Sequence, residues 1–247
     1  MGYIEGFVIA VPTANRQQFI RHATLGDAVF REHGAIRIVE CWQEDVVKGH
    51  TTDFFGAVDA KEDESIVFSW IEWPDKTRRE AMVSRMAEIM KSDDRLDPQK
   101  NPMPFDGARM IHGGFTPIVE QGTGSPGSYV QGFIVPVPND KREAYRKMAE
   151  DVWTLFKDYG ALRLVEAWDD HVPAGKVTDF RRAVKAGADE KIVFSFIEWP
   201  SRTVCDAAHA KMAEDDRMKM TPGQEMPFDG KRLVHGGFTP VVDLGGK

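Results

Sequence analysis

The sequence predicts an α+β fold in which two ferredoxin-like β-α-β-β-α-β modules pair sheet to sheet as a pseudo-dimeric α/β barrel. Three observations support this: a repeat that spans the chain, the same order of strand and helix patterns in each copy, and an aromatic sheet face that needs a cover. The matching blocks are residues 3–7 and 129–133, 34–42 and 160–168, 66–74 and 192–200, and 112–117 and 235–240. A period this long indicates a duplicated domain rather than a solenoid.

Each copy opens with a strand that a proline ends, at Pro12 or Pro138. A helix follows, and in the second copy Asp140 and Glu143 form a capping-box pair while Gly160 supplies the C-terminal cap. Its buried face carries Tyr145, Met148, Val152, Leu155, Phe156 and Tyr159, and the first copy has Phe19, His22, Gly26, Val29, Phe30 and His33 there. The face in the first copy is thinner, which predicts a diverged, looser or wetter first half.

Two short strands come next and bracket an irregular segment that contains Thr-Asp-Phe in both copies. The second helix is expected to start at Thr77 with Glu80, or at Thr203 with Asp206, in the Thr-x-x-acid capping pattern. A Pro-Phe-Asp-Gly turn then leads into the last strand, which ends in Gly-Gly-Phe.

The modules are expected at residues 1–120 and 129–245, joined by a flexible Gly/Ser/Pro linker at 121–128. Alternation assigns to the helix-covered face of the first sheet Gly6, Val8, Ala10, Val39, Cys41, Val67 and Ser69. It assigns to the opposite face Phe7, Ile9, Ile38, Glu40, Trp42, Phe68, Trp70 and Glu72. So large an aromatic surface is not stable in water, so we expect the second module's sheet to cover it.

Ordered blocks in both copies resemble a known bacterial family. They are Gly-Phe-x-x-x-Val-Pro from Gly6, Gly-Ala-x-Arg-x-Val-Glu-x-Trp from Gly34, Val-Thr-Asp-Phe-Arg from Val177, Val-Phe-Ser-x-Ile-Glu-Trp-Pro from Val67 and Met-Pro-Phe-Asp-Gly-x-Arg-x-x-x-Gly-Gly-Phe from Met103. Over nearly all of each copy the sequence is similar to the YbaA-like family of unknown function (domain of unknown function 1428). The resemblance implies a module of the dimeric α/β-barrel class, usually one per chain, and no particular reaction. This chain departs from the pattern in its tandem arrangement and in His112 and His235, where we expect Tyr.

Composition excludes several classes of function. The net charge of −7 argues against nucleic acid and anionic membranes as partners, because both require a basic surface. No signal peptide or membrane span is recognisable, and Cys41 and Cys205 lack the spacing of a disulfide framework or metal site. We therefore expect a cytoplasmic protein with buried thiols, no metal and no cofactor, present as a monomer or weak homodimer.

The candidate catalytic groups are polar residues placed among aromatic ones. They are Glu40, Glu166, Glu72, Glu198, His112 and His235. A carboxyl group held against Trp in a poorly hydrated cavity has a raised pKa and can act as a general acid or base. The alternative is a rim carboxylate paired with Arg37, Arg163, Arg109 or Arg232, or with a backbone donor. For the histidines the alternative is a half-buried strand residue bonded to a carbonyl or carboxylate.

The candidate ligand-binding residues are Trp42, Trp168, Trp70, Phe196, Asp53 and Asp179. A turn-forming role explains the two aspartates about as well as a site does. From these residues we predict that the protein binds a small hydrophobic or aromatic metabolite in the barrel cavity. The alternative is a cofactor-independent enzyme of monooxygenase or isomerase type that uses Glu and His as acid–base groups. RNA binding is disfavoured, because the aromatic-rich RNA-recognition signature is absent.

Overall fold

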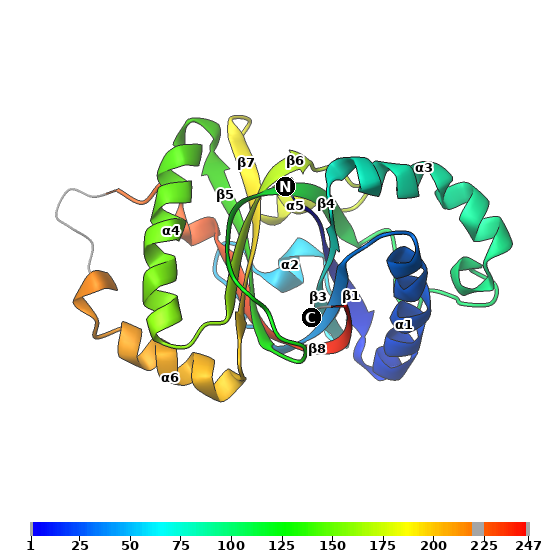
Figure 1. Ribbon diagram of the computed structural model, residues 1–247, viewed down its shortest axis with the longest axis horizontal. Helices are drawn as coiled ribbons and strands as arrows, with labels where there is room; N and C mark the ends of the chain where they lie inside the picture. Colours follow the sequence, from blue (N-terminus) through cyan, green and yellow to red (C-terminus); the bar gives the residue numbers. More distant parts are fainter. Residues whose placement is uncertain (1, 219–224, 246–247) are drawn as a thin grey trace.

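The computed structural model describes residues 2–218 and 225–245, and eight antiparallel strands in them close into a barrel (Figure 1). The strands of the first copy are β1 (Tyr3–Pro12), β2 (Arg37–Asp45), β3 (Glu64–Trp73) and β4 (Ile111–Gly122). Those of the second copy are β5 (Tyr129–Pro138), β6 (Arg163–His171), β7 (Glu190–Trp199) and β8 (Val234–Gly245). The order around the barrel is β1-β3-β2-β8-β5-β7-β6-β4, so the copies join at β2–β8 and β4–β6.

The long helices lie outside the barrel, those of each copy on its own side (Figure 1). They are α1 (Arg16–Glu32) and α3 (Lys76–Ser92) in the first copy and α4 (Arg142–Asp158) and α6 (Arg202–Met212) in the second. Short helices α2 (Phe54–Ala57) and α5 (Phe180–Ala183) contribute to the barrel core. The 3-10 turns are η1 (Thr13–Asn15), η2 (Asp94–Leu96), η3 (Asn139–Lys141), η4 (Asp216–Met218) and η5 (Gly230–Arg232). None of the described helices has the length and apolar character needed to cross a membrane.

Three helix starts differ from those that the sequence patterns predict. The carboxylate of Asp75 caps α3 and the hydroxyl of Ser201 caps α6, each by accepting a first-turn backbone N–H (2.8 and 3.3 Å). Asp75 and Ser201 directly follow the Trp-Pro pairs and already accept a first-turn N–H that has no partner within the helix. Thr77 and Thr203 therefore lie inside the first turn and are not the caps. Asp140 lies in the turn η3, and α4 has no side-chain cap.

The strand register corrects the assignment of sheet faces. Trp70 is paired directly with Gly6 on β1 and with Val39 on β2, and directly paired residues point to the same side of a sheet. The small residues of β1 and β2 and the large residues Phe68, Trp70 and Glu72 thus share the barrel side. Glu40, Trp42, Phe7, Ile9 and Ile38 lie with Val67 and Ser69 on the side that the helices cover.

The physical reason is close packing between the copies. A Cβ atom on Gly6 would lie 2.6 Å from the Phe194 ring, so the glycine is what admits that ring into the barrel. Phe194 stacks on Phe68 with ring centroids 4.6 Å apart, and Trp70 stacks on Phe196 at 4.1 Å. Small and large side chains therefore occupy one interior face and form one core that both copies share.

Candidate functional site

A cavity of about 280 Å³ lies in the first copy, between α1 and the outer face of the sheet. Its walls come from α1, from β1, β2 and β3, and from the end of α3 and the segment that follows it. Most of the lining is apolar, including Phe7, Ile9, Phe19, Phe30, Ile71, Met90, Leu96, Met103, Phe105 and Met110. The polar lining consists of His22, Asp27, Glu40, Ser69, Arg95 and Asn101. This volume is outside the barrel, whose centre is filled by the aromatic core.

Two carboxyl groups line this cavity. Asp27 on α1 and Glu40 on β2 are each 7% exposed, and Asp27 Oδ2 and Glu40 Oε2 have no hydrogen-bond partner. Burial raises the pKa of Glu40 to about 7, against a smaller lowering by a hydrogen bond with Ser69. Burial and the nearby charge of Glu40 raise the pKa of Asp27 well above its ordinary value. Near neutral pH the pair can therefore hold or release a proton.

His22 lines the same cavity in a single tautomer. The Nδ2 of Asn101 donates to the carbonyls of His22 (3.3 Å) and Arg95 (2.7 Å), so its Oδ1 is free to accept. That oxygen lies 3.0 Å from His22 Nδ1, which must then carry the hydrogen, and Nε2 is left as an acceptor when the ring is neutral. Burial lowers the pKa of His22, which favours the neutral ring.

The second copy contains a smaller cavity at the same place, of about 170 Å³, bounded by α4 and the sheet. Tyr145, Met148, Val152 and Trp153 occupy the positions of Phe19, His22, Gly26 and Asp27. The Tyr145 hydroxyl donates to Glu166 Oε2 at 2.7 Å. Burial raises the pKa of Glu166 to about 7, and hydrogen bonds from Tyr145 and Ser195 oppose this. The first copy therefore lacks the tyrosine hydroxyl that binds the glutamate of the second copy, and has gained an acid and a larger cavity.

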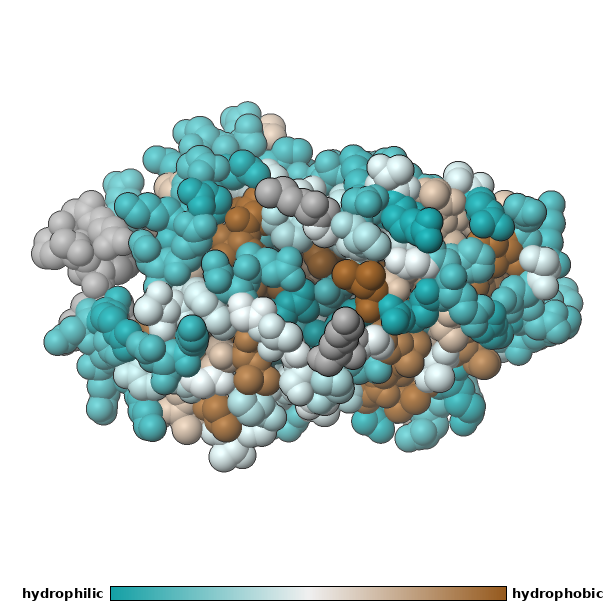
Figure 2. All heavy atoms as spheres, in the orientation of Figure 1, coloured by the Kyte–Doolittle hydropathy of each residue, from teal (hydrophilic) through white to brown (hydrophobic). Residues whose placement is uncertain are grey.

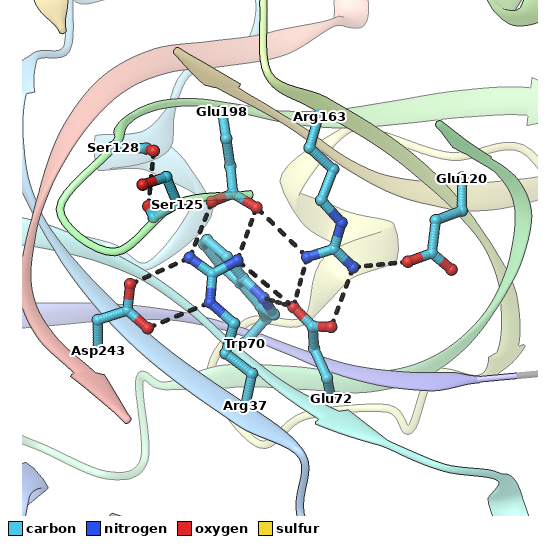
Figure 3. Close-up of polar contacts among 9 residues, drawn as sticks. All are labelled: Arg37, Trp70, Glu72, Glu120, Ser125, Ser128, Arg163, Glu198 and Asp243. Atoms are coloured by element: carbon cyan, nitrogen blue, oxygen red, sulfur yellow. Dashed lines mark hydrogen bonds and ion pairs between the residues drawn. The ribbon is translucent and has the colours of Figure 1, made fainter. Parts of the chain in front are cut away.

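Glu72 and Glu198 lie elsewhere, in a buried ion cluster that joins the copies at one end of the barrel (Figure 3). Arg37 donates two bonds to Glu198, both 2.8 Å, and Arg163 donates two to Glu72, at 2.7 and 2.9 Å. Arg37 also binds Asp243, and Arg163 binds Glu120. Burial acts to raise the pKa of Glu72, but the bonds from Arg163 and Trp70 outweigh it and the pKa is lowered. These bonds cross from one copy to the other, and a longer bond of 3.3 Å joins Arg163 to Glu198 within the second copy. The pairing is the one that the ion-pair alternative describes for these two carboxylates.

The other sequence candidates do not line the cavity. His112 and His235 are exposed and stack on Phe7 and Phe133, with centroids 6.3 and 6.5 Å apart. Trp70 and Phe196 fill the barrel core, while Trp42 and Trp168 lie under Arg16 and Arg142 at 5.6 Å. Asp53 and Asp179 cap α2 and α5 through backbone N–H groups, as the turn-forming alternative holds. His33 caps α1 through the Val29 carbonyl.

Sequence reasoning therefore found Glu40 and Glu166, and noted His22 and Gly26, but missed Asp27 and Asn101. The missed signal was in the repeat: Asp27 stands in a helix where the second copy has Trp153. An acid at a position whose counterpart is a large aromatic marks a local change of environment. Within residues 2–218 and 225–245, no three or more His, Cys, Asp or Glu side chains gather in a way that could hold a metal ion.

Two barrel halves with external helices define the class of the fold, the dimeric α/β barrel, here formed by one chain. A putative monooxygenase from Lactobacillus acidophilus NCFM has a similar structure, with a TM-score of 0.58 and 11% identity over 100% of this chain and 98% of that one. A putative monooxygenase from Fusobacterium nucleatum has a TM-score of 0.57 and 8% identity, over 100% of this chain and 96% of that one. An anthrone oxidase-like protein has a TM-score of 0.52 and 11% identity, over 98% of this chain and 92% of that one.

The chain belongs to the family described as "Protein of unknown function (DUF1428)", which it matches twice, at residues 2–107 and 128–230. A curated relative, the uncharacterised protein YbaA of Escherichia coli K12, is 58% identical over 115 residues, which is 47% of this chain and 97% of that protein. YbaA of Shigella flexneri gives the same values. The predicted family and the tandem duplication are thus confirmed.

Proposed function

We propose that this protein binds a small, largely apolar molecule in the cavity of its first copy, between α1 and the sheet. The observation that carries the proposal is the contrast between the copies. One α-helix opens a cavity with Gly26 where its counterpart has Val152, and adds Asp27 beside Glu40. An apolar cavity of about 150 Å³ binds benzene, so a cavity of about 280 Å³ suits a single substituted ring.

A second candidate function is a cofactor-independent enzyme that moves a proton on such a molecule. The supporting observation is that burial raises the pKa of Glu40 to about 7, the range in which a carboxyl group acts as general acid or base at neutral pH. The structural neighbours named as monooxygenases share the fold at 11% identity or less, so their activities support this candidate by analogy alone.

The test of ligand binding combines native mass spectrometry of the purified protein with calorimetric titration of 2-phenylethanol. Gly26→Val should weaken binding at least about tenfold, because the added side chain enters the cavity. It should also preserve the fold, since a Cβ at this position meets only Leu96, at 3.8 Å. Leu25→Val is the matched control, as that side chain is 44% exposed on the same helix. Equal binding by wild type and Gly26→Val would exclude this cavity.

Four broader assignments belong to the same proposal. The strand order β4-β1-β3-β2 within the first copy, and its counterpart in the second, support ferredoxin-like modules. We retain the module boundaries 1–120 and 129–245, with a linker at 121–128. We also retain a monomer or weak homodimer as the oligomeric state. Figure 2 supports this state, because polar side chains dominate the face it shows and apolar atoms form separate patches. Cys41 and Cys205, both buried and unpaired, support a reducing cytoplasm.

A further inference from the structure

The first-copy cavity contains side-chain hydrogen-bond acceptors that no donor of the protein meets. Among the described residues, the buried side-chain atoms without a hydrogen-bond partner are Asp27 Oδ2, Glu40 Oε2 and Thr52 Oγ1. Two of these three belong to residues that line the same cavity. A buried polar atom without a partner is energetically unfavourable, so a bound molecule that supplies donors to both carboxyl groups recovers free energy.

Other buried carboxylates of this chain have their donors. Arg109 binds Glu64 through two bonds of 2.6 Å, and Arg37 and Arg163 bind the glutamates of the ion cluster. Glu166, the counterpart of Glu40, receives the Tyr145 hydroxyl. At Glu40 the equivalent ring is that of Phe19, which has no hydroxyl group, and a second acid stands nearby. In the described part of the chain, the site thus holds two acids without a counter-ion.

The remaining polar groups that line the cavity do not neutralise this pair. Arg95 on η2 is engaged by Glu32 and Asp93, with bonds of 2.7 Å to each. His22 on α1 presents an acceptor nitrogen when its ring is neutral. The lining residues of β1 and α3, and those of the segment from Pro98 to Met110, carry no charge, and β3 contributes the hydroxyl of Ser69. Among the residues that the structure describes, no free cation therefore lines the cavity to meet Asp27 and Glu40.

We infer that the molecule bound in this cavity is an amine, whose ammonium group donates to Asp27 and Glu40 while its apolar body lies among the Phe and Met side chains. This inference rests on the ligand-binding role proposed above and names the chemistry of the ligand. An ammonium group supplies three donors and a positive charge, which matches two unpaired carboxyl oxygens in a water-poor site. A protonated pair must ionise to bind it, so binding releases protons and strengthens as pH rises.

The experiment is calorimetric titration of the full-length protein with three probes that share one ring and differ in charge. They are 2-phenylethylamine, 2-phenylethanol and 3-phenylpropanoate. At pH 8 the amine should bind at least about tenfold more tightly than the alcohol, because only the amine forms charge-assisted hydrogen bonds, which are roughly twice as strong as neutral ones. The anion should bind least. Amine affinity should fall about tenfold between pH 8 and pH 6, while the alcohol changes little, because only the amine requires an ionised site.

Asp27→Asn and Glu40→Gln should each weaken the amine about tenfold or more and leave the alcohol within about twofold. Glu166→Gln removes the matching carboxyl group of the second copy and should leave both affinities unchanged. Thermal denaturation of each variant establishes that it is folded. If only one of Asp27→Asn and Glu40→Gln folds, that variant alone is enough to test the amine assignment. If the alcohol binds as tightly as the amine, or both first-copy variants keep wild-type amine affinity, the amine assignment is wrong and ligand binding stands. If no probe binds, both proposals are wrong.

Discussion

Replacement of Glu40 by Gln should make the protein more stable at alkaline pH. Burial raises the pKa of Glu40 from 4.5 to about 7 in the folded chain. Between these values the folded state holds a proton that the unfolded state has lost, so stability falls as pH rises through this window. A pKa shift of about 2.5 units corresponds to a loss of stability of about 3 kcal/mol, at 1.36 kcal/mol per unit. This loss is complete above pH 7 and absent below about pH 4.5. Gln keeps the shape but cannot ionise.

The assay is urea denaturation of wild type and Glu40→Gln at pH 5 and pH 8.5. The variant's advantage in free energy of unfolding should grow by about 2–3 kcal/mol between these pH values, with an unchanged denaturant slope. Glu80→Gln, an exposed carboxylate on α3, is the control for the loss of one acidic group. An advantage that is the same at both pH values would refute the argument that burial raises the pKa of Glu40.

Three further predictions concern the junction of the copies. Arg37→Met removes the two 2.8 Å bonds to Glu198, whose side chain is 0% exposed, and leaves it only the 3.3 Å bond from Arg163; it should cost about 3–5 kcal/mol in urea denaturation. Gly6→Ala places a Cβ atom 2.6 Å from the ring of Phe194 and should lower the free energy of unfolding by about 1–3 kcal/mol. Proteolytic cleavage within 123–128 should leave the halves associated in size-exclusion chromatography, because they share one core.

Each of these predictions has a matched control or a contrary outcome. Glu120→Gln alters a half-exposed member of the same ion cluster and should cost less than about 1 kcal/mol; a cost equal to that of Arg37→Met would count against the burial argument. Gly26→Ala, in a helix with room for the methyl group, should stabilise by up to about 1 kcal/mol, opposite in sign to Gly6→Ala. Two separate, folded halves after cleavage would show that each copy folds alone.

The order of strands and helices was predictable because it depends on short-range patterns that occur twice. Proline ends β1 and β5, and the helical spacing of apolar residues marks α1 and α4. The two sheet faces were not predictable, since a residue's side depends on its partner in the next strand. Alternation within β3 places Phe68 and Trp70 on one face, but only pairing with Gly6 and Val39 identifies that face as the barrel side.

The candidate site was predicted in part for the same reason. Glu40 was recognised as a carboxyl group among apolar residues, yet its neighbours Asp27 and His22 come from a helix that packs on the sheet only in the folded chain. The ion cluster of Arg37 and Glu198 likewise joins residues from different copies. Such contacts depend on how the barrel closes, which no local pattern specifies.

By itself, therefore, the sequence determined the duplication, the family, the order of the elements and the need for two sheets to cover each other. The tertiary structure decided that aromatic rings fill the barrel and that the open cavity lies on the helical side of the first copy. The physical reason is that close packing is a property of facing surfaces. Gly6 is an interior residue because Phe194 lies opposite it, and Asp27 is part of a site because Glu40 lies across from it.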